Sequence, residues 1–114
     1  MTTPHLSADT IRTATNEVIR ATEGLRRCAQ ELADVEFEFD TAEATALAAG
    51  VEGGNEAQRK ANLRLRLADQ HATVKGARDR HADARRDLDV AQAILTALRY
   101  QLRLLEVSAA AVAQ

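Results

Sequence analysis

Hydrophobic residues in the first half of the chain recur with the spacing of a coiled coil. One line, whose members are seven residues apart, contains Ile11, Val18, Leu25, Leu32, Phe39 and Ala46. A second line, offset by three, contains Ala14, Ala21, Cys28, Val35, Ala42 and Ala49. These lines are the a and d positions of successive heptads, and a sustained 3.5-residue repeat is typical of a helix that supercoils against another helix. We therefore expect a helix over about residues 8–49, with Ser7 as its N-cap.

Residues 50–55 interrupt the pattern. The segment reads Gly-Val-Glu-Gly-Gly-Asn, and its glycines favour a turn over a continued helix. Asn55 is a good N-cap residue, and Gln58 completes a capping-box pattern with it. A connection this short makes the following helix an antiparallel neighbour of the first.

The second half continues a heptad pattern over about residues 56–112. One line contains Leu67, Val74, His81, Leu88, Leu95, Leu102 and Ala109. The other contains Leu63, Gln70, Ala77, Ala84, Ala91, Leu98, Leu105 and Val112. The stretch 70–76 is the weak point, because Gly76 disfavours a helix interior. The pattern there predicts either a kink or a division into helices of about 56–70 and 77–110.

Together these patterns predict an all-α protein, a single antiparallel coiled-coil helical hairpin spanning residues 1–114. The preferred register pairs residues whose numbers add to 109, so that Ile11 faces Leu98 and Ala14 faces Leu95. Large side chains then face small ones in nearly every layer, as close packing requires. We call the facing a and d positions of the two helices the seam. A register shifted by one heptad would place Glu56 and Lys60 in it.

Charge adds a second constraint on the pairing. Residues 31–43 carry only acidic charges, whereas residues 59–66 carry four basic ones. The hairpin is expected to lay these stretches near each other. Exposed ion pairs contribute little stability, so this arrangement selects register more than it stabilises the fold.

Composition narrows the class of protein. The chain has 24 Ala against one Pro, five Gly and three aromatic residues, which argues against an all-β fold. A net charge of −2 gives no general attraction to nucleic acid or to an anionic membrane. The single Cys, the lack of a signal-peptide pattern and the lack of a long apolar stretch lead us to expect a cytoplasmic protein without a membrane partner.

His81 occupies an a position and is expected to face Cys28. A thiolate–imidazole pair or half of a zinc site would be the chemical interpretation, but zinc needs further ligands and no third group orients the histidine. The favoured interpretation is a polar layer that fixes the register. The carboxylates of residues 31–43 are read as a solvated helix face. We expect no enzyme activity, no metal and no cofactor.

Basic residues between 59 and 86 suggest a second possible interface. The set that could follow a phosphate backbone is Arg59, Lys60, Arg64, Arg66, Arg78, Arg80, Arg85 and Arg86. No aromatic residue lies between them to stack on bases, and aspartates dilute the charge. A solvated helix face is the favoured interpretation, and nucleic-acid binding is the alternative.

The end of the second helix has no predicted partner. If residue 8 faces about residue 101, the seam positions beyond it continue past the first helix. The apolar residues of this region that we expect to bind protein are Tyr100, Leu102, Leu104, Leu105, Val107 and Val112. An unpaired apolar stripe of this kind indicates association with another protein or with a second copy. The alternative is a frayed helix end, or residues 1–6 folding back over the stripe.

The turn region resembles a short motif, G-x-N-x-x-x-R-x-A, of helical-hairpin proteins encoded by bacteriophages. The matching positions are Gly53, Asn55, Arg59 and Ala61. The resemblance implies a phage accessory protein whose gene lies near replication and recombination functions. We expect Arg59 to reach the carbonyls that end the first helix. Members often break the second helix at an Asp-Pro step, which here reads Asp69-Gln70, so a third helix is not expected on this ground.

The sequence therefore predicts a non-enzymatic coiled-coil protein that binds another protein as an accessory or inhibitory factor. One alternative is a nucleic-acid-associated accessory protein of replication or recombination. The other is a structural protein that assembles with copies of itself.

Overall fold

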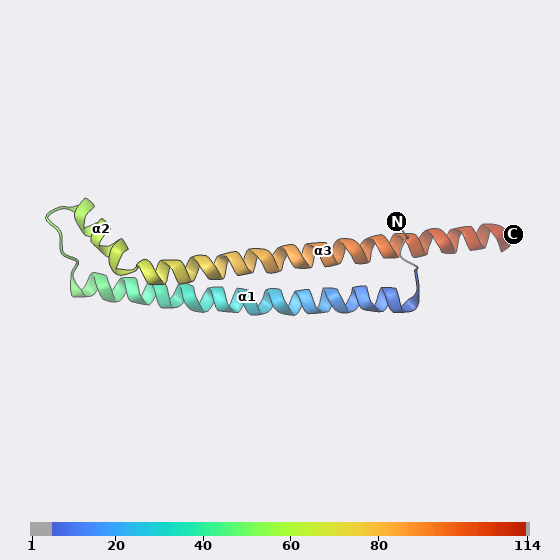
Figure 1. Ribbon diagram of the computed structural model, residues 1–114, viewed down its shortest axis with the longest axis horizontal. Coiled ribbons are helices and arrows are strands. Elements are labelled where there is room, and N and C mark those ends of the chain that lie inside the picture. The colour runs from blue at the N-terminus through green and yellow to red at the C-terminus, as the bar shows by residue number, and fades with distance from the viewer. Residues whose placement is uncertain (1–5, 114) are drawn as a thin grey trace. The chain divides into compact units, whose positions relative to one another are not determined.

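The computed structural model describes residues 6–113, and these residues form three helices. The helices are α1 (Ala8–Ala49), α2 (Glu56–Arg66) and α3 (Ala68–Ala113). α1 and α3 pack against each other as the arms of an all-α hairpin (Figure 1). The predicted fold class is confirmed.

The hairpin divides into two compact units. The terminal unit, in its described part, contains residues 6–25 and 84–113, and the turn unit contains residues 26–83. Each unit has its own contacts between α1 and α3.

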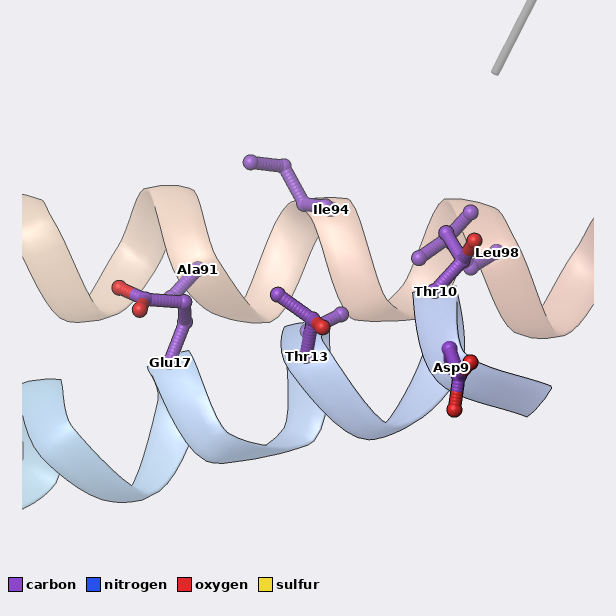
Figure 2. Close-up of a pocket in the computed structure, with 8 residues that line it drawn as sticks. Asp9, Thr10, Thr13, Glu17, Ala91, Ile94 and Leu98 are labelled. Atoms are coloured by element: carbon purple, nitrogen blue, oxygen red, sulfur yellow. The ribbon is translucent and has the colours of Figure 1, made fainter. Parts of the chain in front are cut away.

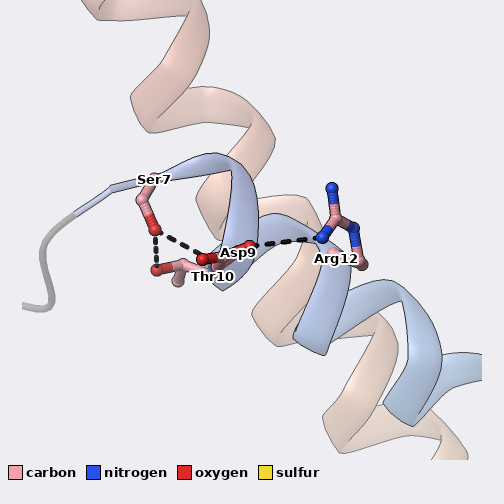
Figure 3. Close-up of polar contacts among 4 residues, drawn as sticks. All are labelled: Ser7, Asp9, Thr10 and Arg12. Atoms are coloured by element: carbon pink, nitrogen blue, oxygen red, sulfur yellow. Dashed lines mark hydrogen bonds and ion pairs between the residues drawn. The ribbon is translucent and has the colours of Figure 1, made fainter.

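α1 begins at the predicted cap (Figure 3). The Ser7 hydroxyl accepts a hydrogen bond from the Thr10 backbone N–H at 3.1 Å, and the Ser7 carbonyl accepts from the Ile11 N–H at 3.1 Å. Asp9 in the first turn complements the positive end of the helix dipole and pairs with Arg12 at 3.3 Å. These contacts satisfy amide groups that have no partner inside the helix.

The core of the terminal unit is a small cluster of Ala14, Leu95 and Leu98, against which Leu6 and Val18 pack. The presence of Ala14 and Leu95 in one buried cluster agrees with the register that adds to 109. The register shifted by one heptad would instead place Ala14 opposite Leu88.

The turn unit shows the same register through different contacts. Its buried residues are Ala46, Leu67, Val74 and Ala77. The rings of Phe39 and His71 lie 4.5 Å apart, and their numbers add to 110. The ion pairs Glu31–Arg80 and Glu36–Arg78 also join α1 to α3. Every predicted seam position from Ile11 to Leu98 is at least half-buried except Ala49 and Gln70, which are exposed.

The turn uses its glycines and its cap in specific ways. Gly50 ends α1 with φ +86°, and its N–H donates to the Leu47 carbonyl at 3.2 Å. Asn55 Oδ1 accepts from the Gln58 N–H at 2.8 Å, and Gln58 Oε1 accepts from the Gly54 N–H at 2.7 Å. The predicted cap is confirmed. Arg59 does not reach the end of α1, because its guanidinium donates instead to the Gly53 carbonyl at 3.4 Å.

The second arm is divided into two helices, as the pattern allowed, but at Leu67 rather than at residues 70–76. The third helix that the missing Asp-Pro step argued against is therefore present. Leu67 has φ −103° and ψ +13°, and α3 continues unbroken through Gly76. The reason lies in the seam. The positions that precede Leu63 and Leu67 by seven residues are Glu56 and Lys60, which cannot be buried there without cost. α2 therefore leaves the seam and keeps these two as an exposed ion pair at 3.5 Å.

This departure also changes the charge pairing. The basic residues of 59–66 were expected beside the acidic stretch 31–43. The ion pairs that join α1 to α3 instead connect Glu31 to Arg80 and Glu36 to Arg78. The expectation holds at the end of the acidic stretch, where Lys60 and Arg64 line a depression together with Glu43, although α2 turns away from the line of α3 (Figure 1). Further from the turn, Arg78 and Arg80 are the partners.

Candidate protein-binding surface

The last part of α3 is an apolar helix segment without a partner among residues 6–113. We call residues 99–113 the overhang. Every residue in it is exposed, whereas Leu95 and Leu98 immediately before it are only 7% exposed. α3 becomes exposed at the level where α1 begins, because Ala8, the first residue of α1, faces about residue 101 in the observed register. Figure 1 shows α3 continuing beyond the start of α1.

All six residues predicted to bind protein lie in the overhang and are exposed. The exposed fractions run from 37% at Leu102 to 87% at Val112. The heptad frame separates them into two groups. Leu102, Leu105 and Val112 continue the seam that is buried up to Leu98, whereas Tyr100, Leu104 and Val107 lie at positions outside it. The seam group is thus the one that a coiled-coil partner would cover.

An apolar groove lies beside the seam in the terminal unit (Figure 2). Ala91, Ile94 and Leu98 of α3 line one side of it. Thr10, Thr13, Ala14 and Glu17 of α1 line the other, with Asp9 at the end. Its carboxylates are already engaged, because Asp9 pairs with Arg12 and Glu17 pairs with Arg20 at 3.0 Å. The groove therefore offers apolar contact area rather than a set of converging polar groups for a small ligand.

Sequence reasoning missed several exposed apolar side chains of this unit. Ile19, Val90 and Ile94 are each about half exposed. They occupy heptad positions outside the seam, and an isolated apolar residue outside a seam is common on protein surfaces. The one available signal was the four-residue spacing of Val90 and Ile94, which puts them on one face of α3.

The basic residues proposed for nucleic-acid binding are distributed over both units. Those of the turn unit are largely engaged: Lys60 pairs with Glu56, Arg78 with Glu36 at 3.6 Å, and Arg80 with Glu31. The hydrogen bonds that Arg80 donates to the Glu31 carboxylate raise the pKa of the Arg80 guanidinium. Arg64 lines a shallow depression beside Glu43. Arg59, Arg66, Arg85 and Arg86 are exposed as well, the last two in the terminal unit, and Arg59 donates to the Gly53 carbonyl.

Cys28 and His81 are both half-buried in the turn unit, and Cys28 is a free thiol. Within residues 6–113, no group of three or more His, Cys, Asp or Glu side chains is arranged to hold a metal ion. The histidine that makes a ring contact is His71, which packs on Phe39 beside Glu36 and Arg78. Sequence spacing alone did not single out this pair, because His71 lies outside the a and d lines.

No protein-family model, curated protein or solved structure matches this chain. A search of the described helices finds none that combines the length and the apolar character needed to cross a membrane.

Proposed function

We propose that this protein is a non-enzymatic binding factor whose overhang pairs with an α-helix of another polypeptide. The observation that carries the proposal is the continuity of the seam. The same heptad lines that bury Leu95 and Leu98 against α1 continue through Leu102, Leu105 and Val112, where α1 no longer covers them.

The energetic argument favours association through this segment. Each large aliphatic side chain that leaves water contributes roughly 1.5–3 kcal/mol when it is fully buried. α3 already provides an extended and registered helix, so a partner helix does not have to bear the cost of nucleating it. A partner helix with small residues opposite the leucines would repeat the layers that α1 forms with α3.

The setting that we propose is an accessory or inhibitory factor in the cytoplasm, encoded by a phage. The resemblance of the Gly53–Ala61 turn to phage hairpins supports the origin. The free thiol of Cys28 is compatible with a reducing compartment. A nucleic-acid-associated role is the second candidate, and the excess of basic over acidic residues in 55–114, 11 against 7, supports it.

The experiment is a comparison of two matched variants in pull-downs from host cells. Leu105→Lys places a charge in the exposed seam, and Val107→Lys places the same charge on the opposite side of the overhang. We expect the purified wild-type chain and Val107→Lys to retain the same partner, and Leu105→Lys to lose it. The captured protein is then identified and its binding is reconstituted with purified components. Equal capture by all three chains contradicts the proposal.

A further inference from the structure

One face of α3 in the terminal unit is uncharged over a wider arc than a two-helix seam requires. Outside the seam, its residues between 90 and 105 are Val90, Ile94, Ala97, Gln101 and Leu104. The basic residues of the same stretch, Arg99 and Arg103, lie on the opposite side of the helix. A helix in a two-stranded coil needs apolar residues only at a and d, whereas a helix that packs on two neighbours also carries them at a flanking position. Ile94 occupies such a flanking position, so α3 has the pattern of a helix that packs on α1 and on one further helix.

This uncharged face reaches from the apolar groove of the terminal unit into the overhang. Ile94 of α3 lines the groove together with Thr13 and Glu17 of α1, and the Glu17 side chain extends toward α3 (Figure 2). Ile94 is about half exposed, and Leu104 and Leu105, on the same face of the overhang, are exposed as well. Leu105 also belongs to the open seam. One helix laid along this face would therefore cover the overhang and contact both walls of the groove.

The charge of the groove comes from a glutamate that meets no basic residue of α3. Glu17 precedes Glu31 by two heptads, and Ile94 follows Arg80 by two heptads, so the two pairs occupy equivalent sites. Glu31 binds Arg80 across the hairpin, whereas α3 offers Glu17 an isoleucine. Glu17 pairs instead with Arg20 of its own helix, at 3.0 Å. An exposed pair of this kind contributes little, so a basic residue of a partner can replace Arg20.

We infer that the partner helix extends from the overhang into the groove, packs on both α1 and α3, and carries a lysine or arginine opposite Glu17. This inference rests on the proposed function, because it states where the same partner helix lies and which charge it carries. The carboxylate of Asp9 at the end of the groove adds to the attraction for a basic edge. The other edge of the partner lies over Ala97 and Leu104 and needs no charge.

The charge of the partner is tested with two designed helical peptides of three heptads. Both have the same face of Leu and Ala, and they carry either Lys or Glu at the flanking positions. Fluorescence anisotropy measures their binding to the purified full chain. We expect the Lys peptide to bind at least about threefold more tightly than the Glu peptide in about 50 mM salt, with a smaller difference in about 500 mM salt. Equal or tighter binding of the Glu peptide, or binding of neither peptide, overturns the inference.

Matched variants test whether the peptides lie in the groove. Glu17→Gln should reduce the preference for the Lys peptide, whereas Glu23→Gln, the same change on the outer face of α1, should preserve it. Ile94→Lys fills the groove and gives Glu17 the cation that Glu31 receives from Arg80, so it should weaken binding of the Lys peptide at least about tenfold. Thr96→Lys places the same charge on the opposite side of α3 and should leave binding within about twofold of the wild type. Circular dichroism should show both lysine variants folded, because both positions are exposed. Equal binding by Ile94→Lys and Thr96→Lys overturns the inference.

Leu105→Lys distinguishes this inference from the proposed function when the host partner identified by pull-down replaces the peptides. We expect both Leu105→Lys and Ile94→Lys to lose that partner. Loss by Leu105→Lys alone would leave the proposed function standing and overturn the placement in the groove. Loss by Ile94→Lys alone would place the partner in the groove without the overhang and would overturn the proposed function.

Discussion

Arg80 and Glu31 connect the two arms of the hairpin across 49 residues of sequence. The Arg80 guanidinium donates hydrogen bonds to both carboxylate oxygens of Glu31. The bond from Nε to Oε2 is 3.4 Å long. Their positions flank the seam at equivalent heptad sites, and their numbers add to 111. The pair thus fixes the register of the turn unit by charge, beside the apolar layers that fix it by shape.

This pair should contribute to stability at neutral and moderately alkaline pH, where Glu31 carries its negative charge. Because Glu31 raises the pKa of Arg80, the contribution is fully present below the unfolded-state pKa of arginine and is lost only as the pH rises through the higher folded-state value. We expect Arg80→Gln to lower the melting temperature by at most a few degrees, because both side chains are about half exposed. The loss should be equal at pH 7 and pH 9, as measured by circular dichroism. A loss that differs strongly between these pH values would contradict this assignment.

Close packing of small residues in the seam makes a second prediction. Ala77 is fully buried, and the register places it opposite Leu32. Ala77→Leu should lower the free energy of unfolding by about 1–3 kcal/mol because the extra methylenes have no room. Ala72→Leu adds the same side chain on the exposed side of α3 and should change stability by less than about 0.5 kcal/mol. Urea denaturation of both variants checks the difference, and equal effects would place Ala77 outside the seam.

The end of the buried seam can be tested by truncating leucines on either side of it. Leu95 is 7% exposed and Leu104 is 67% exposed. Leu95→Ala should cost about 2–4 kcal/mol, because it removes apolar contact and leaves a cavity. Leu104→Ala should be within about 0.5 kcal/mol of the wild type at micromolar concentration. Thermal unfolding followed by circular dichroism distinguishes them, and comparable losses would show that α3 is covered beyond Leu98.

Two glycines should respond to alanine with opposite signs. Gly53 has φ +154°, and an added Cβ would lie 2.7 Å from the Arg59 backbone nitrogen. Gly53→Ala should therefore destabilise the chain by about 1–3 kcal/mol. Gly76 lies inside α3, where an added Cβ would meet only the end of the Arg80 side chain, 3.3 Å away at Nη1. Gly76→Ala should stabilise by about 0.5–1 kcal/mol through helix propensity. Urea titration of both variants gives the change in the free energy of unfolding. Changes of the same sign for Gly53→Ala and Gly76→Ala would refute this account.

The seam was predictable from sequence because the heptad spacing of the apolar residues alone determines which face of each helix is buried. The lines from Ile11 to Ala46 and from Leu63 to Leu98 are those that the structure buries, with the polar Gln70 as the exposed exception within them. Ser7 and Asn55 were predictable for the same reason, since a cap acts within one turn of its own helix.

The position of the break was not predictable from local signals. Gly76 is the conventional weak point, yet it lies within a continuous helix whose neighbours Val74 and Ala77 are buried against α1. The chain bends at Leu67 instead, because the seam positions ahead of Leu63 are the charged Glu56 and Lys60. The resemblance to phage hairpins did not locate the bend either, since the Asp-Pro step is absent. Tertiary packing thus overrides the local propensity at both places.

The binding role of the basic residues can be decided by salt. If Arg59, Lys60 and their neighbours held a phosphate backbone, affinity for a short DNA duplex would fall steeply between 50 and 200 mM salt, by roughly 10³-fold or more for six contacts. Because Arg78 and Arg80 are paired with Glu36 and Glu31, we expect no measurable binding even at low salt. Fluorescence anisotropy of labelled duplex and single-stranded DNA provides the measurement, and tight, salt-sensitive binding would favour the alternative function.

The central claim is that the overhang is a helix whose seam is open until a partner covers it. Amide hydrogen exchange of the full chain, measured for the dilute protein alone and with a bound partner, tests this most directly. We expect residues 101–113 to exchange faster than residues 84–98 in the dilute protein, because no contact with α1 holds their helical hydrogen bonds closed, and to slow when a partner covers the seam. Protection of residues 101–113 equal to that of residues 84–98 in the dilute monomer, or no slowing with an identified partner, would contradict the claim.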